Sequence, residues 1–145
     1  MNWKLVSVFA FAVLFLCVVF LFFTGSIFGR GPISITIQIA AVILLIWARI
    51  AFGFRSFHAA ANPTQGGLVT SGPYRYIRHP IYAAIFYFVW TGIASHFSAR
   101  NVLIGVIASG ALALRIIAEE ILVQRTYPEY AQYAQRTARV LPFIF

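Results

Sequence analysis

Four long apolar runs constrain what this chain can fold into more than any other feature of its sequence. They are Leu5–Phe23, a run from Ile33 to about Phe54, Ile81–Phe97 and Val102–Ala118. A helix needs about 20 mainly apolar residues to cross a bilayer, with a range of roughly 17–25. All four runs fall within that range, although the last two only just do. Because a chain in lipid must satisfy its own backbone hydrogen bonds, the runs predict an all-α fold with four transmembrane helices.

Composition supports an integral membrane protein and argues against a nucleic-acid binder. Hydrophobic residues make up 61% of the 145 residues and charged residues only 10%, whereas about a quarter of a soluble domain is charged. The net charge of +8 comes from basic residues, most of which flank the apolar runs as membrane anchors do. We therefore expect one integral membrane domain that binds no nucleic acid.

Basic residues on the connections predict which side of the membrane each connection faces. Arginines lie between the second and third runs and again after the fourth: Arg55, Arg75, Arg78, Arg125, Arg136 and Arg139. Cytoplasmic loops carry an excess of Lys and Arg, so both regions should be cytoplasmic. The first and third connections hold only Arg30 and Arg100, and these should face outward. With Lys4 before the first run, both termini are expected in the cytoplasm.

The connection from Arg55 to His79 and the tail from Glu119 to Phe145 are expected to form a cytoplasmic cap. Structureless loops longer than roughly 12–15 residues are uncommon, and this connection holds apolar residues that can pack, such as Leu68 and Tyr74. In the tail, tyrosines recur every third residue: Tyr127, Tyr130 and Tyr133. This spacing predicts an amphipathic helix that continues the fourth span. The segment after Arg139 is expected to pack or insert as a short extended piece.

Acidic residues are absent from positions 1 to 118, and the pair Glu119-Glu120 then follows the last apolar run. Arg115 lies four residues before Glu119, so the two share a helix face and can form an ion pair. Arg115 is then either a snorkelling arginine neutralised by Glu119 or a guanidinium that grips a carboxylate at the membrane surface. Glu120 points about 100° away on a helix and is expected to face water or the cytoplasmic loop. By itself, a glutamate pair at a helix end is typical of a solvated surface.

The block Arg78-His79-Pro80-Ile81-Tyr82 sets polar side chains at the start of the third run. A residue before proline favours extended backbone, and proline suits the first turn of a helix. Free amides at that helix start can hold a polar ligand; the alternative is a belt of His and Tyr at the lipid headgroups. No His and Cys cluster with metal spacing occurs in the sequence, so no metal site is expected.

Three segments, in this order, resemble the signature of the isoprenylcysteine carboxyl methyltransferase family, which is related to the membrane phospholipid methyltransferases. They are Leu68 to Tyr74 with Arg78 to Tyr82, then Glu119-Glu120, then a tail with Tyr130, Tyr133 and Leu141-Pro142-Phe143-Ile144. The resemblance extends over roughly Gly66 to Ile144, more than half of the chain. One position departs from the pattern, because the family often has glycine two residues after the motif tyrosine and this chain has Ala84.

The resemblance implies a membrane methyltransferase that uses S-adenosylmethionine without a Rossmann fold. By match of position, the cofactor would be bound by Gly66, Gly67, Leu68, Val69, Tyr74, His79, Pro80, Ile81, Tyr82 and Glu119. Arg115 matches the family's substrate-facing arginine and is the predicted catalytic and substrate-binding residue. The chain would be one methyltransferase domain, 1–145, with an N-terminal transmembrane hairpin over 1–54 and a catalytic region over 55–145. A hairpin of the third and fourth spans would bring the two motifs together as walls of one pocket under the cofactor-binding cap.

The expected acceptor is lipophilic or prenylated and carries a carboxylate, as an isoprenylcysteine-like acid does. A carboxylate, with a pKa of about 4 in water, is already ionised and needs no general base. If Arg115 faces the acceptor, a phospholipid amine is disfavoured, because two cations would meet in a low dielectric.

Other functions stay open at this point. They are N-methylation of a phosphatidylethanolamine-type phospholipid, a small multidrug transporter-like carrier and a non-catalytic membrane subunit. A carrier of cations needs a carboxylate within the membrane, and the first three runs contain none. Gly105 and Ser109, four residues apart, permit close helix packing within or between chains, so the oligomeric state is also open.

Overall fold

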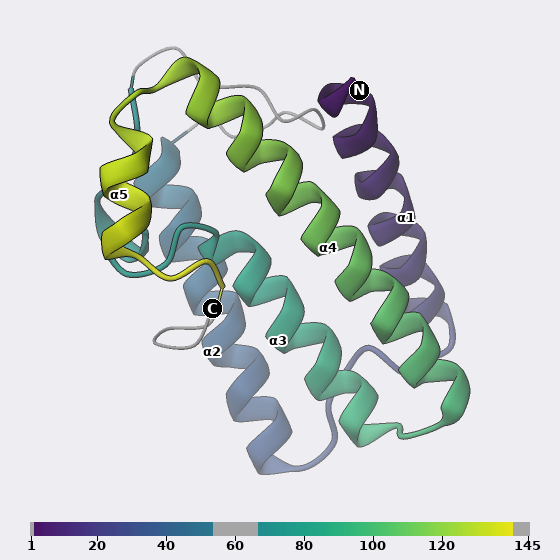
Figure 1. Ribbon diagram of the computed structural model, residues 1–145. Coiled ribbons are helices and arrows are strands. Elements are labelled where there is room, and N and C mark those ends of the chain that lie inside the picture. Colours follow the sequence, from purple (N-terminus) through teal and green to yellow (C-terminus); the bar gives the residue numbers. More distant parts are fainter. Residues whose placement is uncertain (1, 54–66, 141–145) are drawn as a thin grey trace.

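The computed structural model describes residues 2–53 and 67–140, and within these ranges the regular elements are helices. They are α1 Trp3–Phe23, α2 Pro32–Phe52, the 3₁₀ helix η2 Gly72–Arg75, α3 Pro80–Ser95, α4 Ala99–Thr126 and α5 Tyr130–Arg136. Figure 1 shows α1 to α4 as a bundle of long helices, with the short α5 near the end where α2 and α4 finish. The expected all-α fold is confirmed for the described residues.

Three of the four predicted spans are helices long and apolar enough to cross a membrane. Among the described residues, these are α1, α2 and α4, with 21, 21 and 28 residues. α3 has only 16 residues, which is about 24 Å at 1.5 Å per residue, against a hydrocarbon core of about 30 Å. Its backbone leaves the helix at His96, so Phe97 is not part of it. The chain is therefore a multi-pass membrane protein in which the predicted third span is a shorter apolar helix.

The start of α1 and the ends of α2 and α4 lie at the same end of the bundle (Figure 1). This arrangement agrees with a common side for the N-terminus, the long connection and the tail. That this side is cytoplasmic stays a prediction, as does the division of the chain between residues 54 and 55, which falls outside the described residues.

The prediction that the tail continues the fourth span as one helix is wrong. α4 does extend past the predicted end at Ala118, as far as Thr126, but α5 is a separate helix that begins at Tyr130. Between them, Tyr127 has an extended backbone with φ −122° and ψ 100°. It precedes Pro128, and a residue before proline is pushed out of the helical region while proline itself lacks an amide donor.

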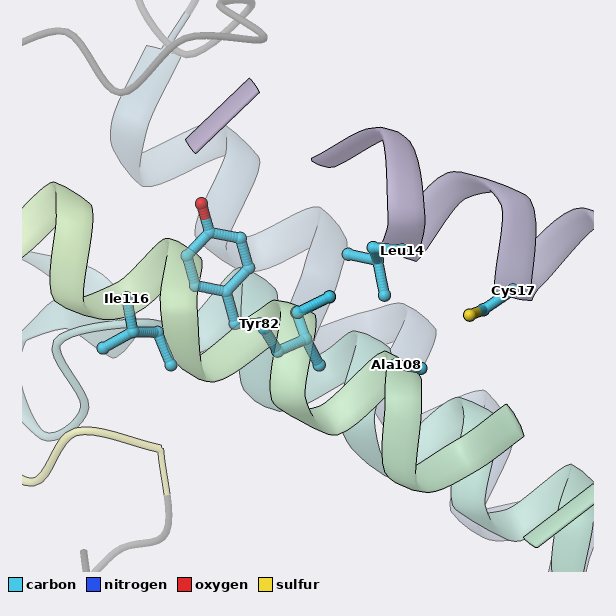
Figure 2. Close-up of a cluster of buried hydrophobic side chains, with 7 residues drawn as sticks. Leu14, Cys17, Tyr82, Ala108 and Ile116 are labelled. Carbon is cyan, nitrogen blue, oxygen red and sulfur yellow. The ribbon is translucent and has the colours of Figure 1, made fainter. Parts of the chain in front are cut away.

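The helices pack as two pairs, α1 with α4 and α2 with α3, and α3 also contacts α4. Leu14 and Cys17 of α1 meet Ala108 and Ile116 of α4 in a buried apolar cluster. Tyr82 of α3 belongs to the same cluster, and Figure 2 shows its hydroxyl oxygen pointing away from the other labelled side chains. Lipid supplies little hydrophobic drive for association, so this close packing holds the pairs together. The same packing places the Tyr82 hydroxyl at the edge of the apolar core.

A glycine and a buried amide fix the connection between α1 and α2 against α3. A Cβ at Gly92 would lie 2.2 Å from the carbonyl oxygen of Ile27, so the connection can approach α3 only because Gly92 has no side chain. Gln38 of α2 donates from Nε2 to the carbonyl oxygens of Ile27 at 2.8 Å and Phe88 at 3.0 Å. Its Oε1 accepts from the amide of Gly29 at 2.8 Å. This buried amide is therefore well satisfied, as apolar surroundings require.

We expect Gly92→Ala to destabilise the protein and Gly110→Ala, its matched control, to leave stability unchanged or slightly raised. A methyl group at position 92 overlaps the Ile27 carbonyl, and overpacking costs about 1–3 kcal/mol. A Cβ at Gly110 would meet nothing within 4 Å, so alanine there adds only helix propensity, up to about 1 kcal/mol. Thermal unfolding in lipid nanodiscs, followed by circular dichroism, measures both. Equal melting temperatures for the two variants would contradict this packing.

Candidate active site

A cluster of charged and polar side chains lies where the start of α3 faces the last part of α4. The two helices are antiparallel (Figure 1), so His79 and Tyr82 meet the pair Glu119-Glu120. Seven side chains form this polar cluster: Arg78, His79, Tyr82, Arg115, Glu119, Glu120 and Arg139. The two sequence motifs are therefore brought together, as the predicted hairpin requires.

Glu119 is joined to Arg115 both directly and through Tyr82. The hydroxyl of Tyr82 donates to Oε1 of Glu119 and accepts from Nε of Arg115 at 2.6 Å. Nη2 of Arg115 lies 3.5 Å from the same carboxylate oxygen, which confirms the ion pair predicted from their spacing. Nδ1 of His79 lies 3.8 Å from the other oxygen, Oε2. The side chain of Glu119 is 24% exposed, so a small molecule can still reach it.

Arg115 is enclosed by the protein. The residue is 6% exposed, and its guanidinium lies over the ring of Phe11 at 5.0 Å. Nη1 also donates to the carbonyl oxygen of Ser7 at 3.3 Å. Contacts with α1 thus cover the guanidinium, which argues against a snorkelling side chain, whereas its neutralisation by Glu119 is confirmed. Contact between Arg115 and an acceptor stays a prediction.

The expectation that Glu120 faces water is wrong, whereas its contact with the loop before α3 is confirmed. Its side chain is 9% exposed, and Oε1 accepts from Nε of Arg78 at 3.1 Å and lies 3.4 Å from Nε2 of His79. Oε2 lies 3.2 Å from Nε of Arg139 in the tail. The reason is that α4 continues to Thr126, so the glutamates lie inside the helix, where the loop and tail cover the side chain of Glu120.

The connection before α3 and the tail after α5 are tied together by backbone hydrogen bonds, and we call this pairing the clasp. Ile77 and Ala138 form an isolated parallel bridge. The amide of Arg78 donates to the carbonyl oxygen of Ala138 at 2.8 Å, and that of His79 donates to Arg139 at 3.0 Å. The amide of His79 is thus engaged by the tail, which limits the expected set of free amides at this helix start.

Side chains reinforce the clasp on both sides. Nη1 of Arg78 donates to the carbonyl oxygens of Ala134 and Thr137, at 2.7 Å for Thr137. The hydroxyl of Tyr133 donates to the carbonyl oxygen of Tyr74 at 2.6 Å. Burial raises the pKa of Tyr133 to about 12, although the nearby guanidinium of Arg78 opposes the rise, so this hydroxyl keeps its proton at neutral pH. The connection and tail therefore pack together, while a cap that encloses a cofactor stays a prediction.

The other predicted cofactor residues lie along the path from the connection into α3. Half-buried positions before η2 and in the first turn of α3 are Gly67, Leu68, Val69 and Ile81. Tyr74 and Pro80 are buried, and the ring of Tyr74 lies 5.4 Å from that of Phe52, centroid to centroid. Gly66 and the ending Leu141 to Ile144 lie outside the described residues. Contact of these positions with a cofactor stays a prediction.

An apolar groove runs between α3 and α4 from the polar cluster toward the middle of the bundle. Its volume is about 210 Å³, and it is lined by Tyr82, Phe86, Ser109, Leu112, Ala113, Ile116, Ile117, Arg139 and Val140. Tyr82 and Arg139 also belong to the polar cluster, so the groove adjoins that cluster at one end. Ile117, at its edge, is 43% exposed, so the groove borders the space that lipid fills.

Three residues complete the site although they were not predicted to belong to it. Arg139 contacts Glu120 and lines the groove, but a turn and a helix separate the two in sequence and no spacing rule connects them. Ser7 gives a weak signal, since a hydroxyl inside a long apolar run is unusual in a span that merely faces lipid. Phe11 gives none, because it is one of 15 phenylalanines in an apolar chain.

Comparison with known proteins identifies the class of enzyme. A model of the family described as phospholipid methyltransferase matches residues 30–130, well over half of the chain. No curated protein and no solved structure gives a match. The match confirms a methyltransferase in place of a transporter-like carrier, but not the isoprenylcysteine family in particular. Methyltransferases of this family use S-adenosylmethionine and act on lipids. With its membrane-spanning helices and this match, the chain belongs to the phospholipid methyltransferase family of membrane methyltransferases.

Proposed function

We propose that this membrane methyltransferase transfers the methyl group of S-adenosylmethionine to a lipophilic acid, an isoprenylcysteine-like carboxylate in the first instance. The observation that carries the proposal is the apolar groove, which adjoins the polar cluster at Arg139 and Tyr82. A hydrocarbon chain suits the apolar walls, and an anionic headgroup suits a guanidinium. A lipophilic acid combines the two groups in one molecule.

The donor set of the polar cluster fits S-adenosylmethionine. When bound, this cofactor supplies a methyl group on a positively charged sulfur. It also carries an ammonium group and a carboxylate, which need an anionic and a cationic partner. Glu119, with 24% of its side chain exposed, is the more accessible of the two glutamates, since Glu120 has 9%. We assign Glu119, His79 and Tyr82 to the cofactor, together with Tyr74 and the segment 67–69.

A carboxylate acceptor needs little chemical activation by the protein. It is ionised at neutral pH and attacks without a general base, so holding donor and acceptor in line supplies much of the rate. Arg139 is proposed to orient the carboxylate through its planar fork of donors. Arg115 keeps its predicted role on the acceptor side, where its Nε lies 2.6 Å from the hydroxyl of the groove residue Tyr82.

A phospholipid amine is the second candidate acceptor, and the description of the matching family favours it. Arg139 would then bind the phosphate of the headgroup. The amine must lose a proton before it can attack the methyl group, so a base is required. Glu120 already serves Arg78 and Arg139, which leaves His79 as the base in this alternative.

We expect the purified protein in nanodiscs to methylate a prenylcysteine acid faster than phosphatidylethanolamine. Arg139→Gln and Arg115→Gln should each lower kcat/KM for the acid by about 100-fold, because misalignment by roughly 1 Å has an effect of that size. Transfer of a radiolabelled methyl group measures both. Arg125→Gln is the matched control, since Arg125 is exposed near the end of α4. Activity on the amine alone, retained in Arg115→Ala, would refute the acid proposal.

Substitutions of Glu119 and of Glu120 should affect different properties of the protein. Glu119→Gln should weaken S-adenosylmethionine binding by about 10- to 100-fold, since losing a charge-assisted hydrogen bond costs about 1.5–3 kcal/mol. Glu120→Gln should instead lower the free energy of unfolding by about 3–5 kcal/mol, because it leaves the buried Arg78 without its carboxylate.

Isothermal titration calorimetry and thermal unfolding separate the two effects. Glu129→Gln is the matched control and should change neither quantity, because Glu129 is exposed. Equal losses of affinity in Glu119→Gln and Glu120→Gln, with unchanged melting temperatures, would contradict this division of roles.

A further inference from the structure

We propose that Trp90 closes the deep end of the apolar groove and sets the length of hydrocarbon chain that the acceptor can carry. The inference rests on the proposed function, since it takes the groove as the binding site of the acceptor's chain. A hydrocarbon chain is the occupant that fits, because the groove is apolar along its length and has Arg139 at one end for an anionic headgroup.

Trp90 crosses from α3 to α4 just beyond the groove. Tyr82, Phe86 and Trp90 follow at four-residue intervals, so they lie along one face of α3, and the first two line the groove. The ring of Trp90 lies 6.1 Å from that of Phe86, centroid to centroid. Nε1 of Trp90 donates to Oγ of Ser109, the groove residue of α4 farthest from the polar cluster, at 3.0 Å. The indole therefore stands across the end opposite the polar cluster.

The indole of Trp90 fits against α4 because Gly105 has no side chain. A Cβ at Gly105 would lie 3.2 Å from Cη2 and Cζ2 of Trp90 and 2.6 Å from Cδ1 of Ile93. The hydroxyl of Ser109 donates to the carbonyl oxygen of Gly105 at 2.8 Å, which leaves Oγ to accept from Trp90. The close helix packing predicted at Gly105 and Ser109 therefore occurs within the chain, between α3 and α4. Removing the indole would open the space beside Gly105 and Ser109 to the groove.

The groove is short for a long-chain lipid. Ser109 and Ile116 lie seven residues apart on α4, which is about 10 Å at 1.5 Å per residue. A chain longer than this must turn out past Ile117 or displace the indole. A hydrogen bond in apolar surroundings is stronger than one in water, so the bond to Ser109 resists that displacement. The wild-type protein should therefore prefer the shorter chains.

The experiment compares prenylcysteine acids whose chains lengthen from geranyl to farnesyl to geranylgeranyl. Trp90→Ala should raise the ratio of kcat/KM for the longest to the shortest acceptor by at least about 10-fold, the effect of one methylene in an apolar pocket. Trp90→Phe, which keeps a ring but loses the donor, should shift the ratio less in the same direction. Phe88→Ala is the control on another face of α3, where Phe88 contacts Phe28, and should leave the ratio unchanged.

A binding measurement separates this inference from the proposed reaction. The chain has three tryptophans, so Trp3→Phe with Trp47→Phe leaves Trp90 as the only indole. Prenylcysteine analogues brominated at the chain end should quench its fluorescence more than analogues brominated near the headgroup. Such quenching without methyl transfer would overturn the proposed function and support the groove assignment. Methyl transfer with an unchanged length preference in Trp90→Ala, or equal quenching by both analogues, would overturn the inference.

Discussion

Two adjacent carboxylates on a largely apolar helix need cations at the same depth, and the arrangement of the site follows from this need. Glu119 and Glu120 share His79 as a neighbour but otherwise meet different cations. Glu119 meets Arg115, whose guanidinium reaches α1. Glu120 meets Arg78 before α3 and Arg139 in the tail. The pair therefore joins the first helix, the long connection and the tail around one turn of α4.

Such a network of buried ion pairs fixes how the helices are arranged more than it adds to the free energy of unfolding. Buried ion pairs gain little over apolar packing of the same volume, whereas breaking one leaves an uncompensated charge. A slip of α3 along α4 would separate His79 and Tyr82 from the glutamates while the apolar contacts found new partners. The network thus holds the register of the two helices, and the register in turn fixes where the groove meets the polar cluster.

Local sequence patterns predicted the structural features that depend on interactions between residues close in sequence. Hydropathy identified the long helices, and the four-residue spacing of Arg115 and Glu119 predicted an ion pair that the structure contains. The tyrosine spacing of the tail failed because Pro128 breaks the helix. The contact of Glu120 with Arg139 was not predictable, because it depends on the tail folding back over α4, and no periodicity encodes it.

The clasp has a consequence for how the protein is made. A chain is synthesised from its N-terminus at about 5–20 residues per second, so Ile77 is made several seconds before its partner Ala138. Until Ala138 pairs with Ile77, Arg78 lacks its tail carbonyls and Glu120 lacks Arg139. The polar cluster is therefore complete only after the tail has been made and has folded back on the connection before α3.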